Sequence, residues 1–241
     1  MQQLTILEID CCDLQNVDAL KALVNLNELE LIGNEGIDIT SIQYLNQLTG
    51  LYLGYCALKD VNALKTLMNL KELSLYANSG IDITSLQYLK QLVYLDIGDC
   101  GLFSLDTLRT LLNLQELYIQ ENEIIYIHPI EQLKRLSIVN AENNKIIDIN
   151  KLQLHNLKQF NIDFQEVPTE GQLIYANKLR SINTPIISLK KLVYKHKKAK
   201  FRSVQTILEN TCVKQIHNNY QKFVQLLSQL FKRLNECEEC Q

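Results

Sequence analysis

The chain has 241 residues and a formal net charge of −3, and it contains 43 leucines but only 8 glycines and 3 prolines. This composition excludes collagen-like and generally disordered chains, and no apolar run reaches the roughly 18 residues that a membrane span needs. The charge is divided along the chain: residues 1–170 carry 23 acidic and 11 basic side chains, whereas residues 171–241 carry 4 and 13. The sequence therefore predicts two regions with different functions.

The first residues contain no secretory signal, because a basic segment followed by an apolar one is missing. The chain has 7 cysteines, an odd number that fits free thiols in a reducing compartment. We therefore expect a cytoplasmic protein. A complete sequence unit opens at Leu4 with no polar segment to cover its apolar side, which predicts either that further chain precedes it or that another surface stacks there.

A leucine recurs every 22 residues and opens the pattern L-x-x-L-x-L-x-x-(N/C) each time. These leucines are Leu4, Leu26, Leu48, Leu70, Leu92, Leu114 and Leu136. An eighth unit opens at Leu157, and residues 179–187 look like a degenerate ninth. The alternating L-x-L core of each unit predicts a strand, and the apolar spacing of three in its second half favours short 3-10 or extended turns. Because one unit alone cannot bury its apolar face, stacked units would share a continuous core.

This pattern resembles the leucine-rich-repeat family, specifically the class with 22-residue units found in the phosphatase-1 regulatory subunit and in bacterial internalins. The resemblance covers about residues 4–190. It implies an α/β fold, in which a curved parallel β-sheet forms the concave face and short 3-10 or extended turns form the convex face. We therefore expect residues 1–190 to form a leucine-rich-repeat solenoid of about eight units plus the degenerate ninth.

The ninth position of the pattern is Asn in some units and Cys in others. An Asn side chain can donate and accept hydrogen bonds for loop backbone that no sheet partner reaches. Cys12, Cys56 and Cys100 occupy units 1, 3 and 5, and the family resemblance implies that Cys is an accepted substitute. We expect these three cysteines to be buried and unpaired beside loop backbone. Gly36 and Gly80, each two residues after an Asn, predict a locally different turn, for which a positive φ is one use of glycine.

Residues 191–241 are predicted to form a basic segment followed by a C-terminal amphipathic helix over about residues 203–234. Its apolar residues fall at heptad spacing, namely Val213, Ile216, Tyr220, Phe223, Leu227, Leu230 and Leu234. The helix could cover the last repeats or bind a partner. The basic run of residues 190–202 could bind RNA or an anionic surface, or it could remain solvated or contact the acidic repeats.

The sequence lacks the motifs of common catalytic and cofactor sites. It has no phosphate-binding G-x-x-x-x-G-K-[ST], no G-x-S-x-G and no H-E-x-x-H. Its one C-x-x-C, Cys237 to Cys240, supplies two ligands where a structural zinc needs four. We therefore expect no catalytic residue, no metal and no cofactor, and a chain that is not an enzyme.

The x residues of the strand pattern x-L-x-L-x should point to the concave face. Over eight units, 9 of these 24 residues are acidic and none is Lys or Arg. Tyrosines occupy four consecutive units, and Tyr is favoured at protein interfaces because it offers apolar area with a polar tip. The predicted partner-binding residues are Glu8, Asp10, Glu28, Glu30, Tyr52, Glu72, Tyr76, Tyr94, Asp96, Glu116, Tyr118 and Glu142.

These residues predict a protein–protein interaction scaffold whose concave face binds a basic protein or peptide. The repeat class leaves a phosphatase-regulatory scaffold open, and the basic C-terminal segment leaves an RNA-associated protein open. The acidic field would repel nucleic acid from the concave face. An internalin-like surface adhesin is disfavoured by the absence of a signal sequence.

Overall fold

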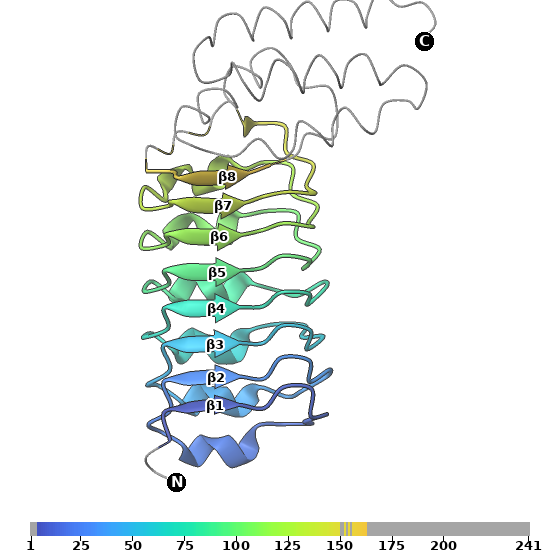
Figure 1. The fold of residues 1–241 in the computed structure, drawn as a ribbon, viewed down its shortest axis with the longest axis vertical. Helices are drawn as coiled ribbons and strands as arrows, with labels where there is room; N and C mark the ends of the chain where they lie inside the picture. Colours follow the sequence, from blue (N-terminus) through green and yellow to red (C-terminus); the bar gives the residue numbers. More distant parts are fainter. Residues whose placement is uncertain (1–3, 150–151, 153, 155, 163–241) are drawn as a thin grey trace, which may run out of the picture. The chain divides into compact units, whose positions relative to one another are not determined.

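The structure is a computed structural model that describes residues 4–149, 152, 154 and 156–162. The described residues form one parallel sheet of eight strands, stacked in chain order (Figure 1). The strands are β1 (Ile6–Glu8), β2 (Glu28–Glu30), β3 (Gly50–Tyr52), β4 (Glu72–Ser74), β5 (Tyr94–Asp96), β6 (Glu116–Tyr118), β7 (Ile138–Asn140) and β8 (Gln159–Asn161). The predicted solenoid of 22-residue units is confirmed over these eight strands. The degenerate ninth unit, the basic segment and the C-terminal helix lie outside the described residues and stay predictions.

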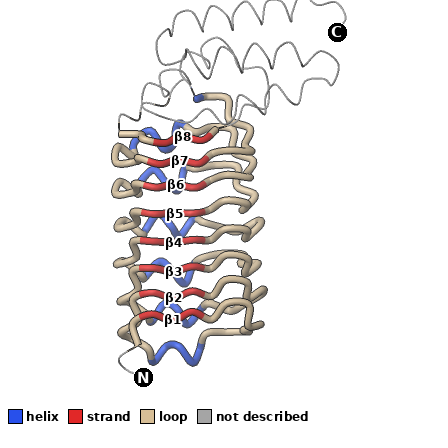
Figure 2. The backbone as a smooth tube through the Cα atoms, viewed as in Figure 1, coloured by secondary structure: helices blue, strands red, loops and turns tan. Residues whose placement is uncertain are grey.

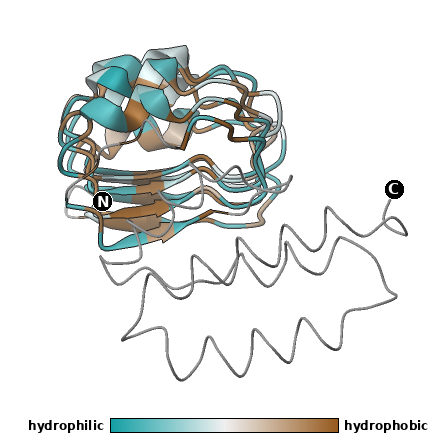
Figure 3. Cartoon of the chain, turned by 90° about the horizontal axis from the view of Figure 1, so that it is seen from above, coloured by the Kyte–Doolittle hydropathy of each residue, from teal (hydrophilic) through white to brown (hydrophobic). Residues whose placement is uncertain are grey.

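Short 3-10 helices form the second layer in units 1 to 6, and they are one of the two forms, 3-10 or extended turns, that the apolar spacing of three predicted (Figures 2 and 3). They are η1 (Asp18–Ala22), η2 (Thr40–Tyr44), η3 (Asn62–Thr66), η4 (Thr84–Tyr88), η5 (Asp106–Thr110) and η6 (His128–Gln132). The L-x-L leucines point between the two layers; Leu51, Leu73 and Leu95, for example, are fully buried. Each such side chain contributes roughly 1.5–3 kcal/mol to folding. The opposite side of the sheet, which we call the concave face, is left for the x residues.

Buried asparagines tie neighbouring units together. The Oδ1 atom of Asn78 accepts the backbone N–H groups of Cys56 and Leu58, and its Nδ2 atom donates to the carbonyls of Leu53 and Leu75. One fully buried side chain therefore satisfies backbone groups of its own unit and of the preceding one. Asn34 and Asn122 bond in the same way.

In the alternate units, where Cys takes the ninth position of the pattern, the thiol makes the hydrogen bond to the backbone. The Sγ atoms of Cys56 and Cys100 each donate to a carbonyl of the preceding unit at 3.2 Å, and both residues are fully buried. The prediction of burial is confirmed for these two. It is wrong for Cys12, which is exposed, because no described unit precedes unit 1 to cover it. All three cysteines are free thiols.

The two glycines that follow an Asn by two residues adopt positive φ, which was one of the uses of glycine considered for these positions. Gly36 and Gly80 both have φ of 76°, and their N–H groups donate to the carbonyls of Cys56 and Cys100. In these units a backbone carbonyl of the next unit accepts this N–H group. In units 1, 3 and 5 the corresponding N–H group donates to the side chain of the next unit's Asn instead. This exchange explains why units with Asn and Gly alternate with units that carry Cys.

Candidate protein-binding face

The strand register places nine of the twelve predicted residues on the concave face in two columns that run along the stack, and the other three follow their strands in a third. The first column contains Glu28, Glu72, Tyr94 and Glu116 in register, and the second contains Glu8, Glu30, Tyr52, Asp96 and Tyr118. Asp10, Tyr76 and Glu142 follow their strands at the position of the third column. The side chains of adjacent strands in such a ladder lie about 4.8 Å apart. The concave residues therefore form a continuous surface.

Carboxylates dominate the surface over β1 and β2. Glu8 and Asp10 are exposed, and Glu28 and Glu30 are half-buried beside them. Partial burial raises the pKa of Glu30, and the negative charges of Glu8, Asp10 and Glu28 raise it further. None of these four carboxylates has an ion-pair partner among the described residues. This surface therefore carries an unbalanced negative field.

Tyr52 on β3 joins the acidic region to the aromatic one. Its hydroxyl donates to the Oε2 atom of Glu72 at 2.6 Å. Partial burial raises the pKa of Tyr52, and so do this hydrogen bond and the charge of Glu72. The side chain of Tyr52 also lies over Gly50, where an added Cβ would meet its ring at 3.6 Å. The hydroxyl of Tyr52 is thus fixed by Glu72, and its ring lies beside Gly50.

The remaining tyrosines form two ring pairs over β4 to β6. The Tyr94 and Tyr118 rings are 5.4 Å apart at 42°, and the Tyr76 and Tyr55 rings are 5.4 Å apart at 65°. Such tilted and edge-to-face pairs are favourable for aromatic rings. Partial burial raises the pKa of Tyr76 and of Tyr94 to about 12 in each case, helped by nearby carboxylates.

Three residues at this surface were not among the twelve predicted partner-binding residues, although Gly98 and Gln120 belong to the 24 positions predicted to face the concave side. Tyr55 follows the strand pattern by one residue, at a position that has positive φ in each of units 1 to 7, 56° in Tyr55 itself. Gly98 lies in the turn after β5, and its missing side chain leaves space for the amide of Gln120, because an added Cβ would lie 2.5 Å from the Nε2 atom of Gln120. The Oε1 atom of Gln120 is buried and has no hydrogen-bond partner. Gly50 and Gly98, in a chain with only 8 glycines, are the sequence signal for such close approaches.

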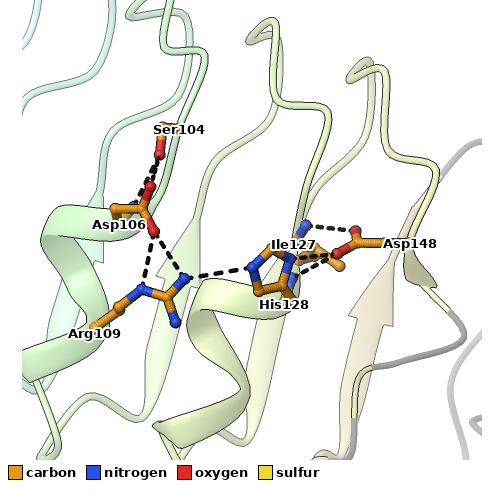
Figure 4. Close-up of polar contacts among 6 residues, drawn as sticks. All are labelled: Ser104, Asp106, Arg109, Ile127, His128 and Asp148. Atoms are coloured by element: carbon orange, nitrogen blue, oxygen red, sulfur yellow. Dashed lines mark hydrogen bonds and ion pairs between the residues drawn. The ribbon is translucent and has the colours of Figure 1, made fainter.

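A second polar cluster lies beside the 3-10 helices η5 and η6 (Figure 4). Asp148 accepts the backbone N–H groups of Ile127 and His128 at 2.7 and 3.1 Å, and it contacts the Nδ1 atom of His128 at 2.7 Å. In preceding units, a side chain of the same unit accepts the backbone N–H at the start of the 3-10 helix, as when Asp82 accepts the N–H of Thr84. Unit 6 has Tyr126 at that position, so the buried Asp148 of the next unit caps its helix instead. The cluster is therefore explained by the fold.

Among the solved structures with a similar fold are three bacterial proteins. An internalin of Listeria monocytogenes has a TM-score of 0.57 and 26% identity, and the match covers 68% of this chain and 55% of that one. Internalin C2 of the same organism has a TM-score of 0.57 and 26% identity, over 66% of this chain and 80% of that one. A leucine-rich-repeat protein of Leptospira interrogans has a TM-score of 0.62 at 23% identity, over 75% and 47%.

The fold and these structures define a leucine-rich-repeat solenoid. The chain is thus a leucine-rich-repeat protein with internalin-like units of 22 residues. No protein-family model matches the sequence, and no curated protein does. The chain spans about half the length of two of the solved structures. Within the part that the structure describes, no helix is long and apolar enough to cross a membrane.

Proposed function

We propose that the chain is a non-catalytic scaffold that binds a basic protein or peptide on its concave face. Solenoids of this kind are typical protein-interaction modules, which supports the general role. The observation that carries the specific proposal is the charge of this face. Its predicted contact residues combine eight carboxylates with four tyrosines, and none of its positions is occupied by Lys or Arg.

The two kinds of residue would act at different stages of binding. The carboxylates over β1 and β2 would steer a basic partner towards the face and accelerate its association. Exposed ion pairs contribute only about 0–1 kcal/mol each, so they supply little of the affinity individually. The half-buried tyrosines over β3 to β6 would be the anchors, because aromatic side chains dominate the energetics of many interfaces.

Free thiols support a reducing compartment for this function. Cys56 and Cys100 donate S–H hydrogen bonds to buried carbonyls, and oxidation of either thiol would remove the donor. Burial raises the pKa of both thiols, to about 11 for Cys100, which keeps them protonated and unreactive. A cytoplasmic location therefore remains part of the proposal.

The alternatives concern the partner rather than the fold. The 22-residue repeat length is the only observation that supports a phosphatase-regulatory scaffold. An RNA-associated protein would use the basic residues 190–202, which lie outside the described residues. The charge of the concave face favours a basic protein partner over nucleic acid at that surface.

The test is an affinity capture from native cytosol with the full chain, carried out with and without nuclease. Two variants remove the proposed determinants: Tyr52→Ala with Tyr118→Ala, and Glu28→Lys, Glu30→Lys and Glu72→Lys together. We expect a basic protein that is captured in both conditions, that is released by salt and that is lost with both variants. Capture that survives both variants, or that nuclease abolishes, would contradict the proposal.

A further inference from the structure

Asp96 is the last residue of β5, which lies between β4 and β6 in the sheet (Figure 1). Its register partners are Ser74 on β4 and Tyr118 on β6. Tyr94 lies two residues before it on the same face of β5, and Gly98 follows two residues after it, in the turn beyond the strand. A carboxylate is thus surrounded by two tyrosines, a serine and a glycine. We call Asp96, Gly98, Gln120, Tyr94 and Tyr118 the Asp96 niche.

The niche holds two acceptors that lack a strong donor. The carboxylate of Asp96 accepts the N–H of Gly98 at 3.0 Å, and none of the described basic residues pairs with it. Gln120 lies beside Gly98 with its Oε1 atom buried and without a partner. A buried polar atom without a hydrogen bond is costly, and most folded proteins avoid one. A ligand that donates to both acceptors would remove that cost.

The tyrosines add a second attraction for a cation. The rings of Tyr94 and Tyr118 are tilted against each other at 5.4 Å, and both are half-buried beside Asp96. The faces of aromatic rings carry negative potential and attract cations within about 6 Å of the ring centroid. Asp96 raises the pKa of both phenols, after the larger effects of burial and, for Tyr118, of Glu116. The rings and the carboxylate are therefore electrostatically coupled.

We propose that the Asp96 niche binds the guanidinium group of an arginine side chain of the partner. The guanidinium would donate to Asp96, and to the Oε1 atom of Gln120 once the Gln120 side chain rotates to expose this buried atom, and its plane would stack on the tyrosine rings. Arginine fits better than lysine because its donors form a planar fork, its charge is weakly hydrated and its plane stacks on aromatic faces. This inference rests on the proposed function and specifies one contact within it.

The carboxylates over β1 and β2 differ from the niche in their selectivity. Glu8 and Asp10 are exposed and have no aromatic neighbour in register. An exposed carboxylate attracts lysine and arginine about equally, since it acts mainly through charge. Preference for arginine over lysine would therefore report on the niche, whereas overall affinity for basic peptides would report on the face as a whole.

The experiment measures binding of two peptides to the full chain by calorimetry at low salt. The peptides have arginines, or lysines at the same positions, separated by glycine and serine. We expect the arginine peptide to bind at least about fivefold more tightly, as bidentate and stacked contacts favour guanidinium. Asp96→Asn should remove this preference, since the amide can still accept the N–H of Gly98 but carries no charge.

The matched control is Asp99→Asn, which removes the same charge from the same unit at an exposed position. It should leave the preference for arginine intact. Glu28→Lys with Glu30→Lys should weaken both peptides equally and keep the preference. Equal affinities for the two peptides, or a preference that persists in a folded Asp96→Asn variant, would contradict the binding of arginine in the Asp96 niche. If neither peptide binds, the proposed function fails together with the niche.

Discussion

The side-chain amide of Gln120 on one unit lies over Gly98 of the preceding unit, so close that a Cβ at Gly98 would be 2.5 Å from the Nε2 atom and 3.0 Å from the Tyr76 ring. The Gly98→Ala substitution should therefore displace both side chains. We expect a small loss of stability, because both obstacles are movable side chains. We also expect loss of most of the preference for the arginine peptide. Calorimetry with the two peptides and thermal unfolding measure these effects.

Gly54→Ala is the control for that substitution. Gly54 lies on the same face, but an added Cβ would have ordinary contacts there, of which the shortest is 3.4 Å, to the carbonyl of Tyr76. Peptide binding should be unchanged. If both variants lose the preference for arginine, the position of Gln120 is not the cause.

Asn78→Ala should be among the most damaging single substitutions in the solenoid. The substitution leaves the N–H groups of Cys56 and Leu58 and two carbonyls without their buried partner. Each unsatisfied buried group costs about 1–3 kcal/mol, so we expect a loss of at least about 3 kcal/mol in the free energy of unfolding. Denaturant unfolding measures it.

The control is Asn69→Ala. The exposed side chain of Asn69 makes one hydrogen bond, to the carbonyl of Asn46, and its loss should cost no more than about 1 kcal/mol. Equal destabilisation by the two substitutions would show that the buried asparagines do not tie the units together.

Cys56→Ser should be tolerated better than Leu53→Ala. A serine hydroxyl can still donate to the carbonyl of Leu31, which the thiol now contacts at 3.2 Å. Leu53 is fully buried between the two layers, and its truncation should cost roughly 2–5 kcal/mol. The midpoints of urea unfolding of the two variants give the order, and a larger loss for Cys56→Ser would contradict the assigned role of the thiol.

Alkaline pH should destabilise the fold through the half-buried tyrosines. The pKa of Tyr94 is about 12 in the folded chain against an ordinary value of 10. The neutral phenol therefore contributes stability that is complete below pH 10 and is lost as the pH rises towards 12. We expect the melting temperature to fall over this range, and to fall less in Tyr94→Phe. The comparison with this variant separates Tyr94 from the Cys100 thiol, whose raised pKa acts in the same direction.

The period of the leucines predicted the strands, their parallel order and a second layer of short 3-10 or extended turns, because one local pattern repeats and each unit contacts only its neighbours. The same pattern placed the twelve concave residues on one face, since side chains alternate along a strand. The binding role of these twelve residues stays a prediction.

Contacts between particular side chains could not be read from the repeat. The capping of unit 6 by Asp148 depends on the chance replacement of a capping residue by Tyr126 one unit earlier. The recess that Gln120 fills depends on Gly98 having no side chain in the preceding unit. The exposure of Cys12 depends on which units are its neighbours. These features arise between units, whereas a periodic pattern describes what each unit has in common.

Photo-crosslinking of a bound peptide shows whether the concave face is the binding surface. The arginine peptide would carry a benzophenone group, and the modified residues of the full chain would be mapped by mass spectrometry. We expect adducts on concave residues of β3 to β6, such as Tyr52, Tyr94 and Tyr118, and fewer of them at high salt. Adducts confined to the 3-10 helices η1 to η6, or to residues 190–241, would contradict binding at the concave face.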